Sequence, residues 1–541
     1  MASIKRRDFI KTSLGAATGL VSGCTAGSFM GFSDHGTGKS PINLLFIMTD
    51  QQRWDALSRA GNKILSTPNL DRLAREGAYF ENAYTACPVC VPARTSMLTG
   101  CGIQTTGIRN NTDFRREGYC QMPTFDNILA SRGYRTEYFG KWHGPIWRAM
   151  DYKSTITQAG IHKTVLGPGF SIYYRQYLDK HVPKRKLKQG EREDMFSLRP
   201  YIPDPLDIGY GLGPEELPKN KEGKPIKRWR QCDAYGQLLI PAEHQPSALY
   251  ADETIDALER CKDRPFSITC SMHHPHAPMI PTKPYYGMYP AKQMPIPVSI
   301  DDPMDNSPYA ELAKTMTLYR DKSKIGYMIS NYYGLVKEID DHVGRILNKL
   351  KELDLEKNTL VIFTSDHGEM LGHHGMQEKA AFYEDSAHIP LIMRLPGLIP
   401  ANTVVSQPVS QLNLFATILD YLGIRSRKSD GRSMQKLING RDKSLFEYAV
   451  TEWDFSHFGI PNFMVRDKDW KFITHRDEKS ENVDALYNLR DDPYEMNNLV
   501  GRNPQRAQSL KQARKMKDML VVWLEKTDSP FLENVKRRPI S

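Results

Sequence analysis

Residues 42–51 read Ile42-Asn43-Leu44-Leu45-Phe46-Ile47-Met48 followed by Thr49-Asp50-Gln51. A continuous apolar run of this length predicts a strand that is buried on both faces, as in a sheet covered by helices on both sides. Further strands are predicted at Tyr134 to Phe139, Phe266 to Cys270 and Thr359 to Thr364. Each of the four runs is followed by polar, titratable residues.

Helical patterns separate these strands along the chain. Helices are predicted from Thr67-Pro68 to Gly77, from about Ala93, at Phe125 to Ser131, at Ala248 to Arg260 and from about Glu311 to Leu353. Two more strands are predicted at Ala78 to Tyr84 and Pro390 to Leu395. The alternation indicates an α/β fold, with a mostly parallel central sheet flanked by helices.

Beyond residue 395 the pattern changes to an amphipathic helix at Ser410 to Leu422, then short strand-like runs and a final helix. The runs are Phe463 to Val465, Trp470 to Thr474 and Ala485 to Leu489, and the helix lies near Gln505 to Leu524. We therefore predict a large domain over residues 40–395 and a smaller C-terminal subdomain with an antiparallel sheet over residues 396–541. Residues 145–245 form a long, proline-rich insert in the first domain, and such inserts are usually functional loops.

The chain has 541 residues and a formal net charge of +10, with a pI near 9.0. This balance favours anionic partners through long-range attraction. Nucleic acid, anionic polysaccharide and acidic lipid all satisfy it. The charge alone therefore does not choose among them.

The first 32 residues have the features of an export signal. Lys5-Arg6-Arg7-Asp8-Phe9-Ile10-Lys11 resembles the twin-arginine signal, and Val21-Ser22-Gly23-Cys24 resembles a bacterial lipobox in which Cys24 would be lipidated. The apolar stretch between them is too short to span a bilayer. We expect export by the twin-arginine machinery, to the periplasm, to the membrane as a lipoprotein, or out of the cell.

The polar residues that follow the four strands are expected to meet. In open α/β sheets, ligands bind outside the carboxyl ends of the strands. The residues placed there are Asp50, Lys141, His143, His276, Asp366 and His367. Asp50 with the pair Asp366-His367 offers oxygen and imidazole donors suited to one divalent cation.

Residues 90–100 read Cys90-Val91-Pro92-Ala93-Arg94-Thr95-Ser96-Met97-Leu98-Thr99-Gly100, a CxPxR element that enters a helix. Cys87 and Cys90 also spell CxxC, which occurs in redox pairs and zinc sites. A four-ligand zinc site needs a second CxxC or paired histidines, and the other cysteines form no such pair. The pairing of the remaining cysteines into disulfides is left open.

The chain resembles the type I, formylglycine-dependent sulfatases of the alkaline phosphatase-like superfamily, and among them bacterial polysaccharide sulfatases. The motifs that carry the resemblance are CxPxR, Gly140-Lys141-Trp142-His143, Pro275-His276, Ser365-Asp366-His367-Gly368, Gly375 to Lys379 and Leu486 to Leu499. They occur in the family's order over nearly the whole mature chain.

The resemblance implies a role for each matched residue. Cys90, oxidised to formylglycine by a maturation enzyme, would attack sulfur, and Arg94 would hold the formylglycine. Lys141 and Lys379 would bind sulfate oxygens. His143 and His276 would orient the nucleophile and protonate the leaving alcohol, in an order left undecided.

The resemblance also implies one divalent cation held by Asp50, Cys90, Asp366 and His367. Calcium is expected, because hard oxygen ligands dominate the set. Many sulfatases carry a second Asp where this chain has Gln51, so whether Gln51 is a ligand stays open.

The sequence thus predicts an exported sulfuric ester hydrolase acting on a sulfated carbohydrate, with ulvan- or carrageenan-type polysaccharides favoured. Neither nucleic acid nor a membrane, apart from a lipid anchor, is an expected partner. In the insert, Trp229 and tyrosines 173, 174, 177 and 210 would stack on sugar rings. The alternatives are a phosphonate or phosphate ester hydrolase on the same scaffold, and a non-catalytic glycan-binding protein with an unmodified Cys90.

Overall fold

A computed structural model describes residues 41–113, 120–144, 181–182, 198–199, 235–310, 320–425, 428–442, 444, 446–454, 462–476 and 482–541. Residues Pro41–Ser541 form one compact unit. The predicted export signal, with Cys24, lies outside the described residues, as do most of the 145–245 insert and the aromatic residues named in it.

The main sheet has seven strands in the order β11-β2-β10-β8-β1-β7-β4. Their bounds are β1 Asn43–Asp50, β2 Ala78–Phe80, β4 Arg135–Gly140, β7 Phe266–Pro275, β8 Thr359–Ser365, β10 Leu391–Arg394 and β11 Thr403–Val405. Strands β8, β1, β7 and β4 run parallel, whereas β10 runs antiparallel to both β8 and β2. The mostly parallel sheet predicted from the sequence is confirmed.

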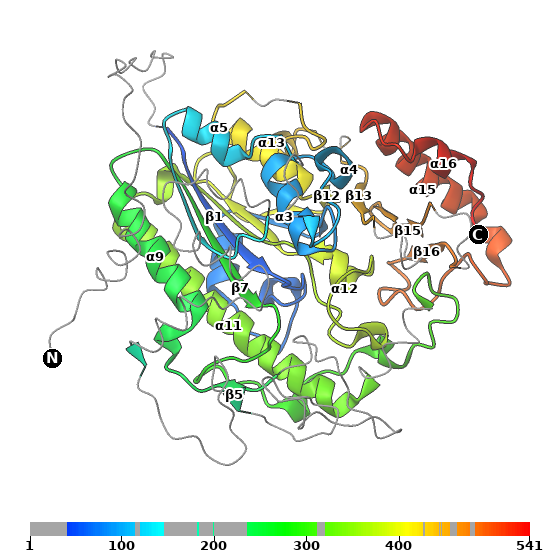
Figure 1. Cartoon of the computed structure of the whole chain (residues 1–541), viewed down its shortest axis with the longest axis horizontal. Helices are drawn as coiled ribbons and strands as arrows, with labels where there is room; N and C mark the ends of the chain where they lie inside the picture. Colours follow the sequence, from blue (N-terminus) through cyan, green and yellow to red (C-terminus); the bar gives the residue numbers. More distant parts are fainter. Residues whose placement is uncertain are drawn as a thin grey trace, which may run out of the picture. The chain divides into compact units, whose positions relative to one another are not determined.

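Strand β1 is apolar throughout because its side chains enter two different cores. Leu44, Phe46 and Met48 pack against helices α3 (Cys90–Thr99), α5 (Phe125–Ser131) and α13 (Leu412–Tyr421). Leu45 and Ile47 point to the other face, where α2 (Pro68–Arg75), α9 (Pro246–Cys261) and α11 (Lys322–Glu352) lie. In Figure 1, α9 and α11 lie along one side of the sheet, and α3, α5 and α13 along the other. Each such buried side chain contributes about 1.5–3 kcal/mol.

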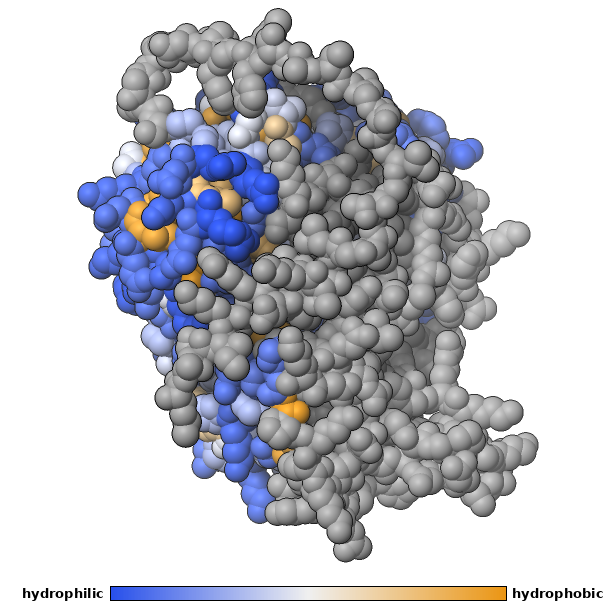
Figure 2. Space-filling model, turned by 60° about the vertical axis from the view of Figure 1, so that its left-hand side comes forward, coloured by the Kyte–Doolittle hydropathy of each residue, from blue (hydrophilic) through white to orange (hydrophobic). Residues whose placement is uncertain are grey.

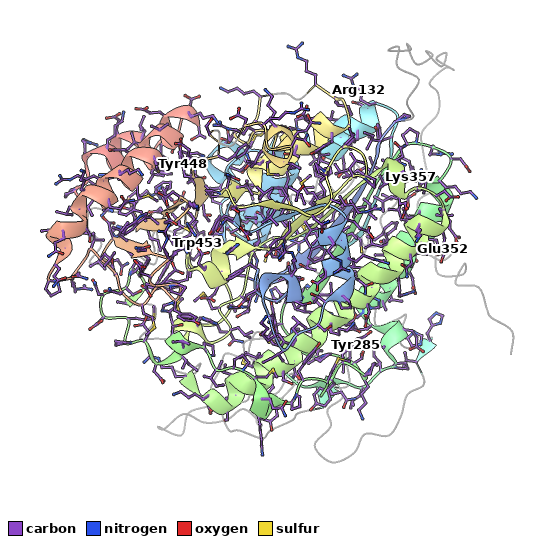
Figure 3. The ribbon with its side chains drawn as sticks, turned by 180° about the vertical axis from the view of Figure 1, so that it is seen from behind. Arg132, Tyr285, Glu352, Lys357, Tyr448 and Trp453 are labelled. Carbon is purple, nitrogen blue, oxygen red and sulfur yellow. The ribbon has the colours of Figure 1, made fainter. Side chains whose placement is uncertain are left out.

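The long helix α11 begins at Lys322, after Asp321, whose side chain accepts hydrogen bonds from the backbone N–H groups of Ser323 and Lys324. This cap explains its start; residues 311–319, where the predicted helix began, lie outside the described residues. Figure 3 shows α11 from behind, with Glu352 at its end. Tyr285 lies beside it and donates a hydrogen bond of 3.1 Å to Asp341.

The predicted strand from Ala78 to Tyr84 is two strands in different sheets. After β2 the chain leaves the main sheet, and β3 (Ala83–Tyr84) pairs instead with β12 (Val409–Ser410) and β9 (His388–Ile389). Asn82 supports the break, since its side-chain amide donates a hydrogen bond to the backbone of Ser406. The main sheet also includes β11, beyond residue 395.

The C-terminal part holds a second sheet, antiparallel as predicted, of β13 (Ala449–Glu452), β14 (Phe463–Arg466), β15 (Trp470–Thr474) and β16 (Ala485–Asn488). Helices α15 (Arg506–Lys526) and α16 (Leu532–Arg537) share its core. Strand β13 was not predicted. The remaining short α-helices and strands among the described residues are α4 (Ile103–Thr106), α12 (Glu384–Ala387), α14 (Gln435–Ile438), β5 (Leu198–Arg199) and β6 (Gln237–Leu238).

The described residues on one face of the molecule are mainly polar (Figure 2). On the face in Figure 2, hydrophilic residues predominate and hydrophobic ones stand singly. Scattered apolar residues are normal on surfaces that face water. Among the described residues, no helix combines the length and apolar character needed to cross a membrane.

Candidate active site

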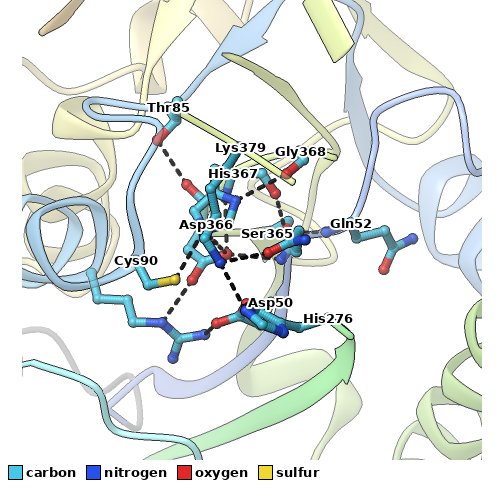
Figure 4. A network of polar contacts seen from close by, with 12 residues as sticks. Asp50, Gln52, Thr85, Cys90, His276, Ser365, Asp366, His367, Gly368 and Lys379 are labelled. Carbon is cyan, nitrogen blue, oxygen red and sulfur yellow. Dashed lines mark hydrogen bonds and ion pairs between the residues drawn. The ribbon is translucent and has the colours of Figure 1, made fainter. Parts of the chain in front are cut away.

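The candidate site lies where four neighbouring parallel strands end. Asp50 is the last residue of β1, and Asp366 follows the end of β8. Lys141 follows β4, and His276 follows β7. The sheet order β8-β1-β7-β4 therefore brings together residues that are far apart in the sequence, as Figure 4 shows for Asp50, His276 and Asp366.

Backbone contacts fix two of these strand ends. Gly140 has a φ of +104°, and a Cβ there would lie 1.8 Å from the carbonyl oxygen of Ser271. Only glycine allows this close approach, after which the Lys141 N–H donates to the same oxygen at 2.8 Å. The His276 N–H donates to the backbone oxygen of Asp50 at 3.1 Å. Both residues are thereby held at the edge of the sheet.

Helix α3 begins at Cys90, and Arg94 follows one turn later on the same face. The guanidinium of Arg94 contacts Asp50 Oδ2 and Asp366 Oδ2, each at 2.8 Å, with all three side chains fully buried. It also donates to the carbonyl of Lys141 and to Ser271 Oγ. Burial opposes its charge, yet the two carboxylates hold the pKa of Arg94 above its ordinary value. Arg94 thus ties the start of α3 to three strand ends.

Cys90 lies on the inner side of the site, with 1% of its surface exposed. Its Sγ is 3.1 Å from His367 Nε2 and 4.0 Å from Lys141 Nζ. Burial and the charge of Asp50 act to raise the pKa of Cys90, but Lys141, Lys379 and His367 outweigh them and hold it well below its ordinary value. The position favours a negatively charged group.

Four side chains could hold a cation. Asp50, Cys90, Asp366 and His367, all buried, each offer one ligand atom, and these atoms lie within 4.8 Å of one another. Asp50 Oδ1 is buried and has no hydrogen-bond donor among the described residues, a costly state for a carboxylate oxygen. Burial, together with the charge of Asp50, raises the pKa of Asp366 to about 6. The group therefore fits a divalent cation, and it is the ligand set predicted from the sequence.

The open side of the site carries the other predicted residues, which are less buried: Lys141, His143, His276 and Lys379. Lys141 Nζ lies 2.7 Å from Asp50 Oδ2. Lys379 Nζ lies 2.8 Å from His276 Nε2. The site thus has an anionic, buried floor and a cationic, accessible rim, an arrangement that suits an anion bound above a cation.

Both rim histidines are neutral near pH 7. Burial and the charge of Lys141 lower the pKa of His143 to about 4. Burial, then Lys379 and Lys141, hold the pKa of His276 well below its ordinary value. Because the Lys379 ammonium can only donate, His276 Nε2 accepts, and its Nδ1 carries the proton that is donated to the carbonyl of Ala277 at 2.7 Å. The neutral state of His276 thus has one tautomer.

The sequence analysis did not identify several residues that support the site. Thr85 Oγ1 and Gln411 Nε2 both donate to the backbone oxygen of Asp366, at 2.7 and 2.8 Å, and Ser271 contacts Arg94. Thr85 and Ser271 lie within a few residues of the motifs and Gln411 lies far from them, but all three are ordinary polar residues that no local pattern marked. Glu369 was overlooked although it directly follows the Ser365 to Gly368 motif.

Two family models match the chain. The model described as sulfatase matches residues 42–424. That described as N-sulphoglucosamine sulphohydrolase, C-terminal, matches residues 372–521.

Known relatives resemble the chain over most of its length. An arylsulfatase from Clostridium perfringens is 29% identical over 85% of this chain and 90% of its own. An N-acetylglucosamine-6-O-sulfatase from Bacteroides thetaiotaomicron is 26% identical over 91% of this chain and 87% of its own. The solved structure of BT4656 in complex with its substrate D-glucosamine-2-N,6-O-disulfate has a TM-score of 0.65, with 20% identity, over 92% of this chain and 100% of that one.

Proposed function

Because the chain belongs to the sulfatase family and is a sulfuric ester hydrolase, we propose that it removes sulfate from sulfated carbohydrates. We further propose that Cys90 is converted to formylglycine for this reaction. The observation that carries the proposal is the position of Cys90. Its Sγ, which stands where the oxygens of formylglycine would lie, belongs to the cation-binding group and is flanked by His367 and Lys141.

The chemistry follows from the two sides of the site. Formylglycine supplies a hydroxyl nucleophile through its hydrate, and a divalent cation, expected to be Ca²⁺, supplies Lewis acidity when held by Asp50, Cys90, Asp366 and His367. Lys141 and Lys379 bind sulfate oxygens and offset their charge. One of His143 and His276 would orient the nucleophile, and the other, after taking up a proton, would protonate the leaving oxygen; which residue does which is left open.

Sulfated carbohydrate is the substrate class that best fits the relatives and the charge. The Bacteroides relative is named for a sulfated amino sugar, and BT4656 was solved with a disulfated glucosamine. A net charge of +10 favours polyanionic chains. We propose polysaccharides or their oligosaccharides, with ulvan- and carrageenan-type chains retained as candidates from the sequence.

The test of the nucleophile combines mass and activity. The tryptic peptide that contains Cys90 should be lighter than the thiol form by the exchange of H₂S for O. Cys90→Ala should abolish hydrolysis of an aryl sulfate, whereas Cys87→Ala, in the same CxxC, should retain it. Finding only the thiol in protein from the native host, or full activity in Cys90→Ala, would contradict the proposal.

The test of the substrate compares ester classes and sugars. We expect faster turnover of an aryl sulfate than of an aryl phosphonate monoester, and a large preference for the phosphonate would favour the alternative hydrolase. Sulfate release from defined sulfated glucosamine, ulvan and carrageenan oligosaccharides then identifies the sugar. Release from none of these, beside a good rate on the aryl ester, would argue against the carbohydrate assignment.

We also propose that the protein is exported, because of the arginine pair and Cys24 near its start. Replacing Arg6 and Arg7 by Lys should leave the protein in the cytoplasmic fraction. Cys24→Ala should move it from the membrane fraction to the soluble periplasmic one. A wild-type protein found wholly in the cytoplasm would refute export.

A further inference from the structure

The side-chain amide of Gln51 lies between two charged groups, Glu369 and Lys379. Its Nε2 donates to Glu369 Oε2, and its Oε1 accepts from Lys379 Nζ at 2.6 Å. Gln51 and Glu369 are both fully buried. A neutral amide therefore connects a buried carboxylate to the ammonium at the rim of the site.

Glu369 cannot turn away from this amide. Its other carboxylate oxygen, Oε1, accepts the backbone N–H groups of Leu371 at 2.9 Å and Glu378 at 2.6 Å. A carboxylate offers only acceptors, so it selects the NH₂ end of Gln51 and turns the amide oxygen toward Lys379. This orientation pairs a donor with an acceptor at both ends, which is the criterion for assigning an amide.

The backbone of Gln51 is held as firmly as its side chain. Its φ of +67° lies in the left-handed region, which a non-glycine residue adopts only when its surroundings require it. Its N–H donates to Asp366 Oδ1 at 3.0 Å, and its carbonyl accepts from Tyr332 Oη at 2.8 Å. The amide therefore leaves β1 in one fixed direction.

Lys379 has a second contact that depends on its position. Its Nζ donates to His276 Nε2 at 2.8 Å, while Ala380, the next residue, bonds through its N–H to the carbonyl of Pro88, two residues before Cys90. If the ammonium of Lys379 moved, His276 Nε2 would lose its hydrogen-bond donor, and the anion site would lose a positive charge.

We propose that Glu369 and Gln51 are positioning residues: Glu369 fixes the orientation of the Gln51 amide, and the amide oxygen holds the Lys379 ammonium where it binds a sulfate oxygen. The inference rests on the proposed function, which makes Lys379 a sulfate ligand. It also explains the amide at position 51, because an Asp or Glu there would set a second carboxylate against Glu369.

The decisive variant is Glu369→Gln, which exchanges one carboxylate oxygen for an NH₂ group. Its amide oxygen can still accept from the backbone N–H groups of Leu371 and Glu378, so its NH₂ then donates to Gln51. Gln51 must turn over and present its own NH₂ to the ammonium of Lys379, donor against donor. We expect the affinity of the mature, Ca²⁺-loaded protein for inorganic sulfate, measured by calorimetry, to fall about tenfold or more, as for a lost charged hydrogen bond.

The reciprocal change should restore binding. In Gln51→Glu combined with Glu369→Gln, the new amide at position 369 donates to the new carboxylate at position 51, whose other oxygen faces Lys379. The double variant should bind sulfate within about threefold of wild type, whereas Gln51→Glu alone, with two carboxylates in contact, should bind weakly. Gln51→Met, which fits the space without either hydrogen bond, should match Glu369→Gln. The exposed Gln508→Glu is the control and should change nothing.

Wild-type affinity in Glu369→Gln, or a double variant no better than its singles, would overturn the inference. If wild type neither binds sulfate nor cleaves an aryl sulfate, the proposed function fails instead. In that case the contact between Gln51 and Glu369 is tested by the free energies of unfolding in urea. A double variant that regains the stability lost in the single variants supports the exchange of donor and acceptor. Losses that simply add in the double variant overturn the inference.

Discussion

Arg94 makes it possible for two carboxylates to lie buried side by side. Asp50 and Asp366 both contact its guanidinium, and none of the three side chains is exposed. A buried charge that loses its partner is far more costly than an exposed one. The CxPxR motif identified Arg94 from the sequence, but its partners could not be derived locally, because each comes from a separate strand.

Arg94→Met should therefore be strongly destabilising. The change leaves two buried carboxylates without their shared cation, and we expect a loss of about 3–5 kcal/mol in the free energy of unfolding. Urea denaturation monitored by circular dichroism measures it. Arg132→Met, at the exposed end of α5 (Figure 3), is the matched control and should stay within about 0.5 kcal/mol. Equal losses in the two variants would contradict this account.

Glu452, the last residue of β13, gives a pH-dependent prediction. Burial, with the charge of Asp430, raises the pKa of Glu452 to about 8 from an ordinary value of 4.5. Between these values the folded state keeps a proton that the unfolded state has released, so this group lowers the free energy of unfolding as pH rises.

The glutamine in Glu452→Gln cannot ionise, so the free energy of unfolding of this variant should not fall with pH for this reason. The variant should match wild type near pH 5 and become progressively more stable than wild type up to about pH 8, with no further gain above it. Urea denaturation at several pH values measures the difference. A stability difference that is constant across this range would refute the shifted pKa.

Lys471 on β15 joins the C-terminal sheet to the segment that follows Lys379. Its fully buried ammonium lies 2.7 Å from Glu384 and 2.8 Å from Glu495, and it donates to the carbonyl of Phe382 at 2.8 Å. The C-terminal sheet therefore holds the chain just beyond a rim residue of the active site. Alternating patterns predicted β14, β15 and β16, but β13 has the sequence Ala449-Val450-Thr451-Glu452, which ends in a polar residue and offers little pattern.

Lys471→Met should weaken both stability and activity. It leaves two buried carboxylates close together, so we expect about 3–5 kcal/mol lower unfolding free energy. Faster proteolysis between β9 and Lys379 should accompany a higher KM for aryl sulfate. Lys468→Met, on the exposed turn before β15, should behave as wild type. A normal KM in a destabilised Lys471→Met protein would limit its role to stability.

At the scale of the whole molecule, periodicity predicted the parallel sheet and the edge where its strands end. Strands β1 and β8 contain continuous apolar runs, and β1, β7 and β8 are buried along their whole length, so a local pattern predicts them. The antiparallel insertion of β10 and the small sheet around β3 depend on pairings between distant, very short strands. Such pairings are decided by tertiary packing, so no local pattern reveals them.

A cation held by Asp50, Cys90, Asp366 and His367 would couple the stability of the whole fold to metal binding. Ca²⁺ should raise the free energy of unfolding, by about 2.7 kcal/mol at a hundredfold excess over Kd. Chelator should remove the gain, and Asp366→Asn should abolish the response. The exposed Asp263→Asn should keep it. A melting temperature indifferent to Ca²⁺, Mg²⁺ and Mn²⁺ alike would count against a structural cation at these residues.

The depth of Cys90 has a consequence for how the protein is made. All residues of α3 are buried, and the cysteine lies at its first position beneath Lys141 and beside His367. An enzyme that must bind the residues around this thiol can reach them only while the polypeptide is still unfolded. If Cys90 is converted to formylglycine as proposed, the conversion would have to precede folding, and a chain that folded first would keep the unmodified thiol.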